Sequence, residues 1–102
     1  MKAIKELVEN INEELEDAEK YAKLAMHYKS EDSRLADTYS RLSSEELGHS
    51  EQLHAHAVRI IEAYRAAGNV APPAMMAVWD WEHKKSVEHK MEIKALMEMY
   101  KG

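Results

Sequence analysis

The strongest constraint on the fold is an apolar repeat of about 3.6 residues that runs through three long stretches of the sequence. Only three glycines and two prolines are present, and most of them fall at the ends of these stretches. Gly68-Asn69 suits a helix C-terminus, Pro72-Pro73 prevents that helix from continuing, and KSEDS (29–33) offers side chains that can cap a new helix. We therefore expect an all-α fold whose first two helices form an antiparallel hairpin. The three predicted helices span about 2–29, 32–67 and 74–100.

The composition narrows the classes of function. The 102 residues are enough for one domain, 1–102. A net charge of −5 without a basic face argues against nucleic acid, and no apolar run approaches the ~20 residues that a membrane helix needs. Because the N-terminus is too charged for a signal peptide, we expect a cytoplasmic protein. The sequence has no cysteine, so any metal ion must be held by oxygen and nitrogen atoms.

Each predicted helix has a line of apolar residues that is broken near its middle by ionisable side chains. The breaks are Glu14 in the first helix, Glu46 and His49 in the second, and Glu82 and His89 in the third. A carboxylate buried alone is strongly unfavourable, so it needs a proton, a cation or a metal ion. No lysine or arginine lies on the central lines. Carboxylates and neutral imidazole are ligands that divalent ions accept, and we therefore expect a metal ion between the helices.

The spacing of Glu46 and His49 supports a metal site. Residues at i and i+3 share one helical face, with β-carbons ~5–6 Å apart, so both side chains can reach one ion. Glu-x-x-His together with a Glu from a neighbouring helix recurs in the dinuclear sites of helical bundles. Gly48 lies between the two residues and lowers helix stability by ~1 kcal/mol, which a close approach of another helix would explain.

Two segments carry a resemblance to a known family. In ELEDAEKY (14–21) a Glu precedes a Tyr by seven residues, and LADTYSRLSSEELGHSEQL (35–53) contains the Glu-x-x-His pair. Together they resemble the first half of a ferritin-like or rubrerythrin-like di-iron bundle. The resemblance implies two iron ions per site, or manganese, which has the same ligand preferences. It also implies that Tyr21 hydrogen-bonds a ligand carboxylate. The implied ligands are Glu14, Glu46 and His49.

The resemblance further implies an activity and a partner. The activity is oxidation of Fe2+ to Fe3+ by O2 or H2O2, a ferroxidase reaction in iron storage or detoxification. A full bundle of this family has four helices and a second Glu-x-x-His, whereas the third predicted helix here offers Glu82 and His89 instead. The encapsulated-ferritin type resembles this arrangement, because its half-size chain dimerises to join two ligand sets across a two-fold axis. We therefore expect a homodimer or higher homo-oligomer to complete the bundle.

A different class of function fits the same pattern. A helical interaction protein without metal could use a central polar layer to fix the register of its partner helices, at some loss of stability. The two hypotheses predict different amounts of metal bound to the protein, and they differ in whether Glu46 and His49 are needed to bind it.

Overall fold

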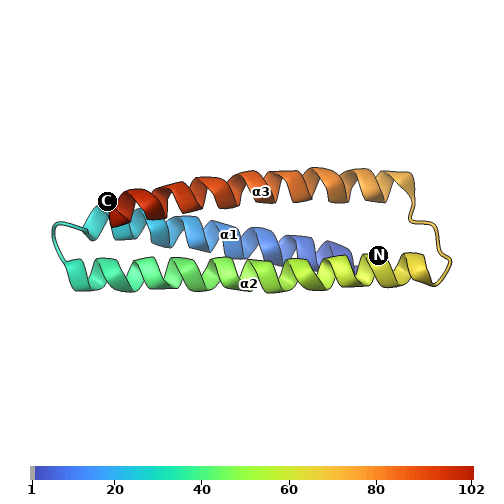
Figure 1. The fold of residues 1–102 in the computed structure, drawn as a ribbon, viewed down its shortest axis with the longest axis horizontal. Helices are drawn as coiled ribbons and strands as arrows, with labels where there is room; N and C mark the ends of the chain where they lie inside the picture. The colour runs from blue at the N-terminus through green and yellow to red at the C-terminus, as the bar shows by residue number, and fades with distance from the viewer. Residues whose placement is uncertain (1) are drawn as a thin grey trace.

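The computed structural model describes residues 2–102 as three helices: α1 (Lys2–Tyr28), α2 (Ser33–Ala66) and α3 (Pro73–Lys101). They form an elongated bundle of 56 × 18 × 17 Å in which α2 runs antiparallel to α1, and α3 runs parallel to α1 (Figure 1). No strand occurs in residues 2–102. The predicted all-α fold is confirmed, and every predicted helix end lies within one residue of the observed end.

Local chemistry accounts for the ends of the helices. The Asp32 side chain accepts a hydrogen bond from the backbone N–H of Leu35 (3.1 Å) and so caps α2. After α2, Gly68 has a φ of +86°, a conformation that is strained for residues with a β-carbon. Pro73 is the first residue of α3. A backbone N–H at this position would have no partner within the helix, so the lack of one in proline does not weaken the helix.

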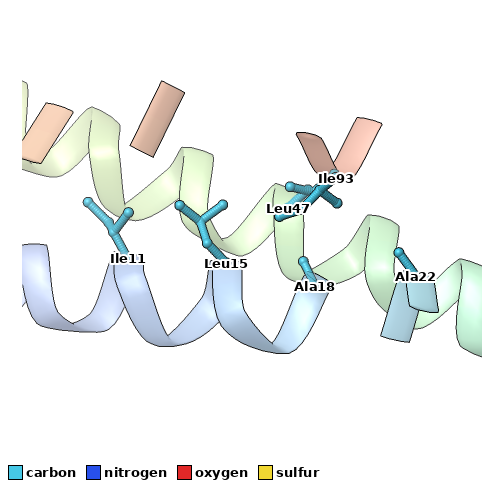
Figure 2. Close-up of a cluster of buried hydrophobic side chains, with 6 residues drawn as sticks. All are labelled: Ile11, Leu15, Ala18, Ala22, Leu47 and Ile93. Carbon is cyan, nitrogen blue, oxygen red and sulfur yellow. The ribbon is translucent and has the colours of Figure 1, made fainter. Parts of the chain in front are cut away.

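The core lies along the seam between α1 and α2, and α3 closes it. One cluster of buried side chains comes from all three helices (Figure 2): Ile11, Leu15, Ala18, Ala22, Leu47 and Ile93. A second cluster nearer the N-terminus contains Ile4, Ala57 and Ile61. Alanines on α1 leave room for a close approach of α2, so that buried Ser43 of α2 donates a hydrogen bond to the carbonyl of Ala18 (2.7 Å).

The structure corrects the rotation of α2 about its axis. The buried line of α2 contains Leu47 and Ser50, so the prediction that Glu46 and His49 lie on it is wrong by one residue. On α1 the predicted line is partly right, because Ile4, Ile11, Ala18 and Ala25 are buried, whereas Leu15 rather than Glu14 completes the buried face. On α2 one residue corresponds to a rotation of about 100°, which moves the predicted line to the edge of the seam. The half-buried members of the two predicted lines form an α1/α2 flank, whose apolar side chains are Leu7, Tyr21, Tyr28, Tyr39, Leu42, Leu53 and Ile60.

Helix α3 packs on the opposite side of α1 from this flank. Asn12 and Glu19 of α1 contact α3, and they lie about 140–160° around the helix from Glu14. Lys90 of α3 pairs with Glu51 of α2 (3.4 Å). The hydroxyl of Tyr100 on α3 donates a hydrogen bond to the carboxylate of Asp37 near the start of α2. Among the described helices, none is long and apolar enough to cross a membrane.

Candidate metal centre

Three of the predicted ligands converge on the α1/α2 flank. Nδ1 of His49 lies 3.6 Å from Oε2 of Glu14 and 3.5 Å from Oε1 of Glu46. One potential ligand atom from each residue lies within 4.8 Å of the other two, and no other such cluster occurs in residues 2–102. The loop between α1 and α2 is short, so residues that are equally distant from this loop face each other across the antiparallel hairpin. Glu14 of α1 therefore lies beside Glu46 and His49 of α2.

The two carboxylates are partly buried, whereas the imidazole opens to solvent. The exposed fractions of the side chains are 19% for Glu46, 28% for Glu14 and 53% for His49. Oε2 of Glu14 is buried and accepts no hydrogen bond. An unpartnered carboxylate oxygen is unfavourable in such a position, and a proton or a metal ion would satisfy it.

The proximity of the carboxylates raises the pKa of Glu46 from 4.5 to about 7. The largest cause is the hydrogen bond between the carboxyl groups of Glu46 and Glu14, which exists only while one of them is protonated. Burial of Glu46 and the negative charge of Glu14 raise the pKa further, and Asp17 adds a smaller effect. The positive charge that His49 can carry acts in the opposite direction. Below about pH 7, the cluster therefore holds a proton that a bound cation would displace.

This arrangement can bind a divalent cation. Two carboxylates and one imidazole form the oxygen-and-nitrogen ligand set that Fe2+, Mn2+ and Zn2+ accept. Because His49 faces solvent, an ion can reach the cluster without movement of a helix. Three protein ligands leave coordination positions open, so a single chain provides an incomplete shell for two ions.

The other predicted site residues lie elsewhere. Glu82 accepts a hydrogen bond from Nδ2 of Asn12 (3.2 Å) and pairs with Lys85 (3.7 Å). Nε2 of His89 lies 3.4 Å from Oε1 of Glu19. The structure thus brings neither Glu82 nor His89 into the cluster, because α3 contacts α1 on the side away from Glu14.

Tyr21 lies on the same flank as the cluster, but its ring packs against another tyrosine. The rings of Tyr21 and Tyr39 are stacked, with centroids 6.0 Å apart. The sequence interpretation overlooked Tyr39, although it precedes Glu46 by seven residues just as Tyr21 follows Glu14 by seven. It also overlooked Asp17, one turn after Glu14 and close enough to affect Glu46.

Gly48 has a different role from the predicted one. A β-carbon at this position would meet no atom within 4 Å, apart from its own helix backbone and chain neighbours. The expectation that another helix approaches closely at Gly48 is therefore wrong. The space beside it is an open groove between α2 and α3, which Leu47, Glu51 and Met97 help to line.

Comparisons with known proteins give no relative for this chain: no family model, curated protein or solved structure matches it.

Proposed function

We propose that this protein is a ferritin-like di-metal protein that oxidises Fe2+ to Fe3+ with O2 or H2O2, in iron storage or detoxification. The observation that carries the proposal is the convergence of Glu14 with the Glu46/His49 pair. In addition, an unpartnered carboxylate oxygen lies in this cluster, and a carboxyl group holds its proton up to about pH 7. Each of these features raises the free energy of the metal-free protein, and a cation would relieve both.

A second copy of the chain completes the site in this proposal. Two-fold pairing of α1/α2 flanks would bring together two Glu14, two Glu46 and two His49 side chains. These four carboxylates and two imidazoles are the ligand set of dinuclear sites in helical bundles. The flank has half-buried apolar side chains on both sides of the cluster, including Leu7 and Tyr21 on α1, and Leu42 and Leu53 on α2. Their burial in a dimer would favour association and exclude water from the site.

The residues have separate tasks in the reaction. Fe2+ is the substrate, and it supplies the electrons that reduce the oxidant. Glu14 and Glu46 neutralise its charge, and His49 adds a nitrogen ligand on the exposed side of the cluster. Loss of the proton from Glu46 accompanies binding, so the uptake of an ion releases a proton.

Metal binding is the first test. The purified protein is freed of metal with a chelator, supplied with Fe2+ under argon, and then desalted. We expect about one iron per chain, equal to two in each dimer. Glu46→Ala and His49→Ala should each abolish binding. The matched controls, Glu45→Ala and His56→Ala, change exposed residues outside the cluster and should retain it.

Association is the second test, and it leaves the ligands intact. Leu42→Lys places a charge on the α1/α2 flank, whereas the control Met91→Lys changes a side chain on α3 that is 66% exposed. Sedimentation velocity should show a dimer for the wild type and for Met91→Lys, and a monomer with little iron for Leu42→Lys. A wild-type protein that binds neither Fe2+ nor Mn2+, and whose stability does not respond to them, would instead support the metal-free interaction protein.

A further inference from the structure

A groove of about 640 Å³ runs between α1 and α3 near the start of both helices. Its apolar wall includes Ile4 and Val8 of α1, and Val78 and Trp79 of α3. Ile4 is buried and belongs to the core, whereas Val78 is 61% exposed. The wall therefore continues the core outward as apolar surface that a ligand would cover, in a groove whose size suits a small molecule.

The α1/α3 groove lies on the side of α1 away from the candidate metal centre. Asn12 lines the groove, and it lies about 160° around α1 from Glu14. Pairing of two α1/α2 flanks, as in the proposed function, thus leaves the groove open. Its occupation requires neither a metal ion nor a dimer.

The inner end of the groove is closed by polar groups that already have partners. Glu82 accepts a hydrogen bond from Asn12 (3.2 Å) and pairs with Lys85 (3.7 Å). Because α1 and α3 run parallel and begin at the same end of the bundle (Figure 1), this hydrogen bond sets their register. Lys2 and Lys5 therefore lie at the opposite, outer end of the groove.

Lys5 is the group at the outer end that is available to an anion. Its side chain is exposed and forms no ion pair within residues 2–102, whereas Lys2 pairs with Glu6 (3.9 Å). α3 also begins at this end, and its N-cap residue Pro72 has no side chain that could cap it. The positive end of a helix dipole adds to the attraction of Lys5 for a negative group.

The carboxylates that line the groove lie further in. Glu9 is on the lip, one turn after Lys5, and Glu82 is at the inner end. An anionic group is thus attracted at the outer end and repelled deeper in the groove, where the wall is apolar. This charge distribution favours a molecule with a negative head and an apolar tail, bound in one direction.

We propose that the α1/α3 groove binds the anion of a long-chain fatty acid. The carboxylate lies beside Lys5, and the hydrocarbon chain extends inward along Val8, Val78 and Trp79 toward Asn12. The levels of Lys2 and Asn12 are about 15 Å apart along α1, so the groove suits an extended chain better than a compact ring system. Its volume holds a single chain, which favours a free fatty acid over a lipid with two chains.

The first experiment measures binding by calorimetry with metal-free protein. Dodecanoate is the probe, at concentrations too low for micelles, and we expect one molecule per chain. Hexanoate should bind at least tenfold more weakly, because each buried methylene group raises the affinity about fourfold, or ~0.8 kcal/mol. Dodecyltrimethylammonium has the same chain with a positive head group, and it should also bind at least tenfold more weakly than dodecanoate.

Two substitutions test the wall and the outer end separately. Val78→Glu places a charge on the wall at an exposed position and should abolish binding, whereas the control Met91→Glu changes an exposed residue of α3 outside the groove. Lys5→Gln should weaken dodecanoate binding several-fold but leave the binding of dodecanol, which has no charge, unchanged. The control Lys84→Gln removes a lysine outside the groove and should bind dodecanoate as the wild type does.

Fluorescence locates the bound chain. The sequence has two tryptophans, so Trp81→Phe, which changes a residue that is 59% exposed, leaves Trp79 as the single emitter. Trp79 is half-buried in the wall of the groove, and a hydrocarbon chain against its ring would exclude water. Dodecanoate should therefore shift the emission of Trp81→Phe protein to shorter wavelength.

Several results would overturn the proposal. A wild-type protein that does not bind dodecanoate would do so, as would binding that Val78→Glu leaves unchanged or that does not alter the emission of Trp79. An oligomer that Val78→Glu dissociates in sedimentation velocity without ligand would assign the groove to a second copy of the chain. Flotation with phosphatidylglycerol vesicles that requires Lys5, without binding of dodecanoate, would assign it to a membrane surface.

The metal centre is tested independently of the groove. Glu46→Ala should lose iron but bind dodecanoate as the wild type does, and Val78→Glu should lose dodecanoate but keep iron. Dodecanoate binding that disappears in Glu46→Ala protein of normal helix content would contradict a site on the opposite side of α1.

Discussion

Replacement of Glu46 by glutamine should stabilise the metal-free protein, because the folded structure opposes ionisation of the Glu46 carboxyl group. The folded protein keeps a proton on Glu46 up to about pH 7, whereas the unfolded chain releases it near pH 4.5. Between these values the unfolded state binds fewer protons, so the free energy of unfolding falls as the pH rises. A shift from 4.5 to about 7 corresponds to about 3 kcal/mol at 1.36 kcal/mol per pKa unit. Solvent access at His49 screens the interaction, and we expect about 1–2 kcal/mol.

The amide that Glu46→Gln introduces cannot ionise, and it can donate a hydrogen bond to Glu14, as protonated Glu46 does. Glu46→Gln should therefore match the wild type near pH 4.5 and exceed its stability by about 1–2 kcal/mol at pH 8. For a domain of this size, that difference raises Tm by roughly 4–16 °C. The assay is thermal unfolding followed by circular dichroism, with chelator present and at one protein concentration, since association would affect Tm.

Two comparisons make this prediction specific. Glu45→Gln removes the same charge from an exposed neighbouring position and should leave the pH dependence of Tm unchanged. Addition of Fe2+ or Mn2+ should reverse the order, raising Tm for the wild type but not for Glu46→Gln. The reasoning is refuted if Glu46→Gln is no more stable than the wild type at pH 8, or if its advantage is the same at pH 4.5 as at pH 8.

Individual residues give four further predictions. Apparent affinity for Mn2+, measured by calorimetry, should rise several-fold between pH 6 and pH 8, with proton release, because the ion displaces the proton of Glu46; affinity that is independent of pH would contradict this. Gly48→Ala should stabilise the protein by about 1 kcal/mol in urea unfolding, because a β-carbon meets no atom there. Gly68→Ala should destabilise it by a similar amount, because of the φ of +86°. A loss of stability with Gly48→Ala would contradict the first expectation, and a gain with Gly68→Ala would contradict the second. Burial, His83 and Lys90 lower the pKa of His54 below 6.5. The wild type should therefore lose stability as the pH falls below 6.5, because the unfolded chain binds the proton more readily. His54→Leu should remove that loss, whereas the control His56→Leu should not.

The pairing of α1 with α2 shows how much of the site was available from the sequence. Glu46 and His49 share a face because they are three residues apart in a helix, whatever surrounds that helix. The short turn at 29–32 then requires α1 to run back along α2, which brings Glu14 near the same level. Local helix geometry and chain connectivity are thus enough to predict this cluster of three residues.

The assignment of Glu82 and His89 depended on information that the sequence does not contain. The line of half-buried positions on α3 was predicted correctly, but which side of the hairpin α3 covers depends on packing between distant segments. Ile93 enters the core cluster between α1 and α2, and this contact directs Glu82 toward Asn12 and His89 toward Glu19. No local pattern in α3 distinguishes that side from the flank with the cluster.

The sequence by itself determined three helices, their ends and their order, because glycine, proline and capping residues act within a few residues of their own position. It also determined that Glu46 and His49 would share one face of α2. Only the tertiary structure decided that Leu47, rather than Glu46, enters the core. The line through Leu47 and the line through Glu46 differ by a rotation of α2 of about 100°. Which of them is buried depends on the complementary surface of α1. The buried alanines of α1 leave room for the buried serine and leucine side chains of α2, and the ionisable residues remain at the edge of the seam.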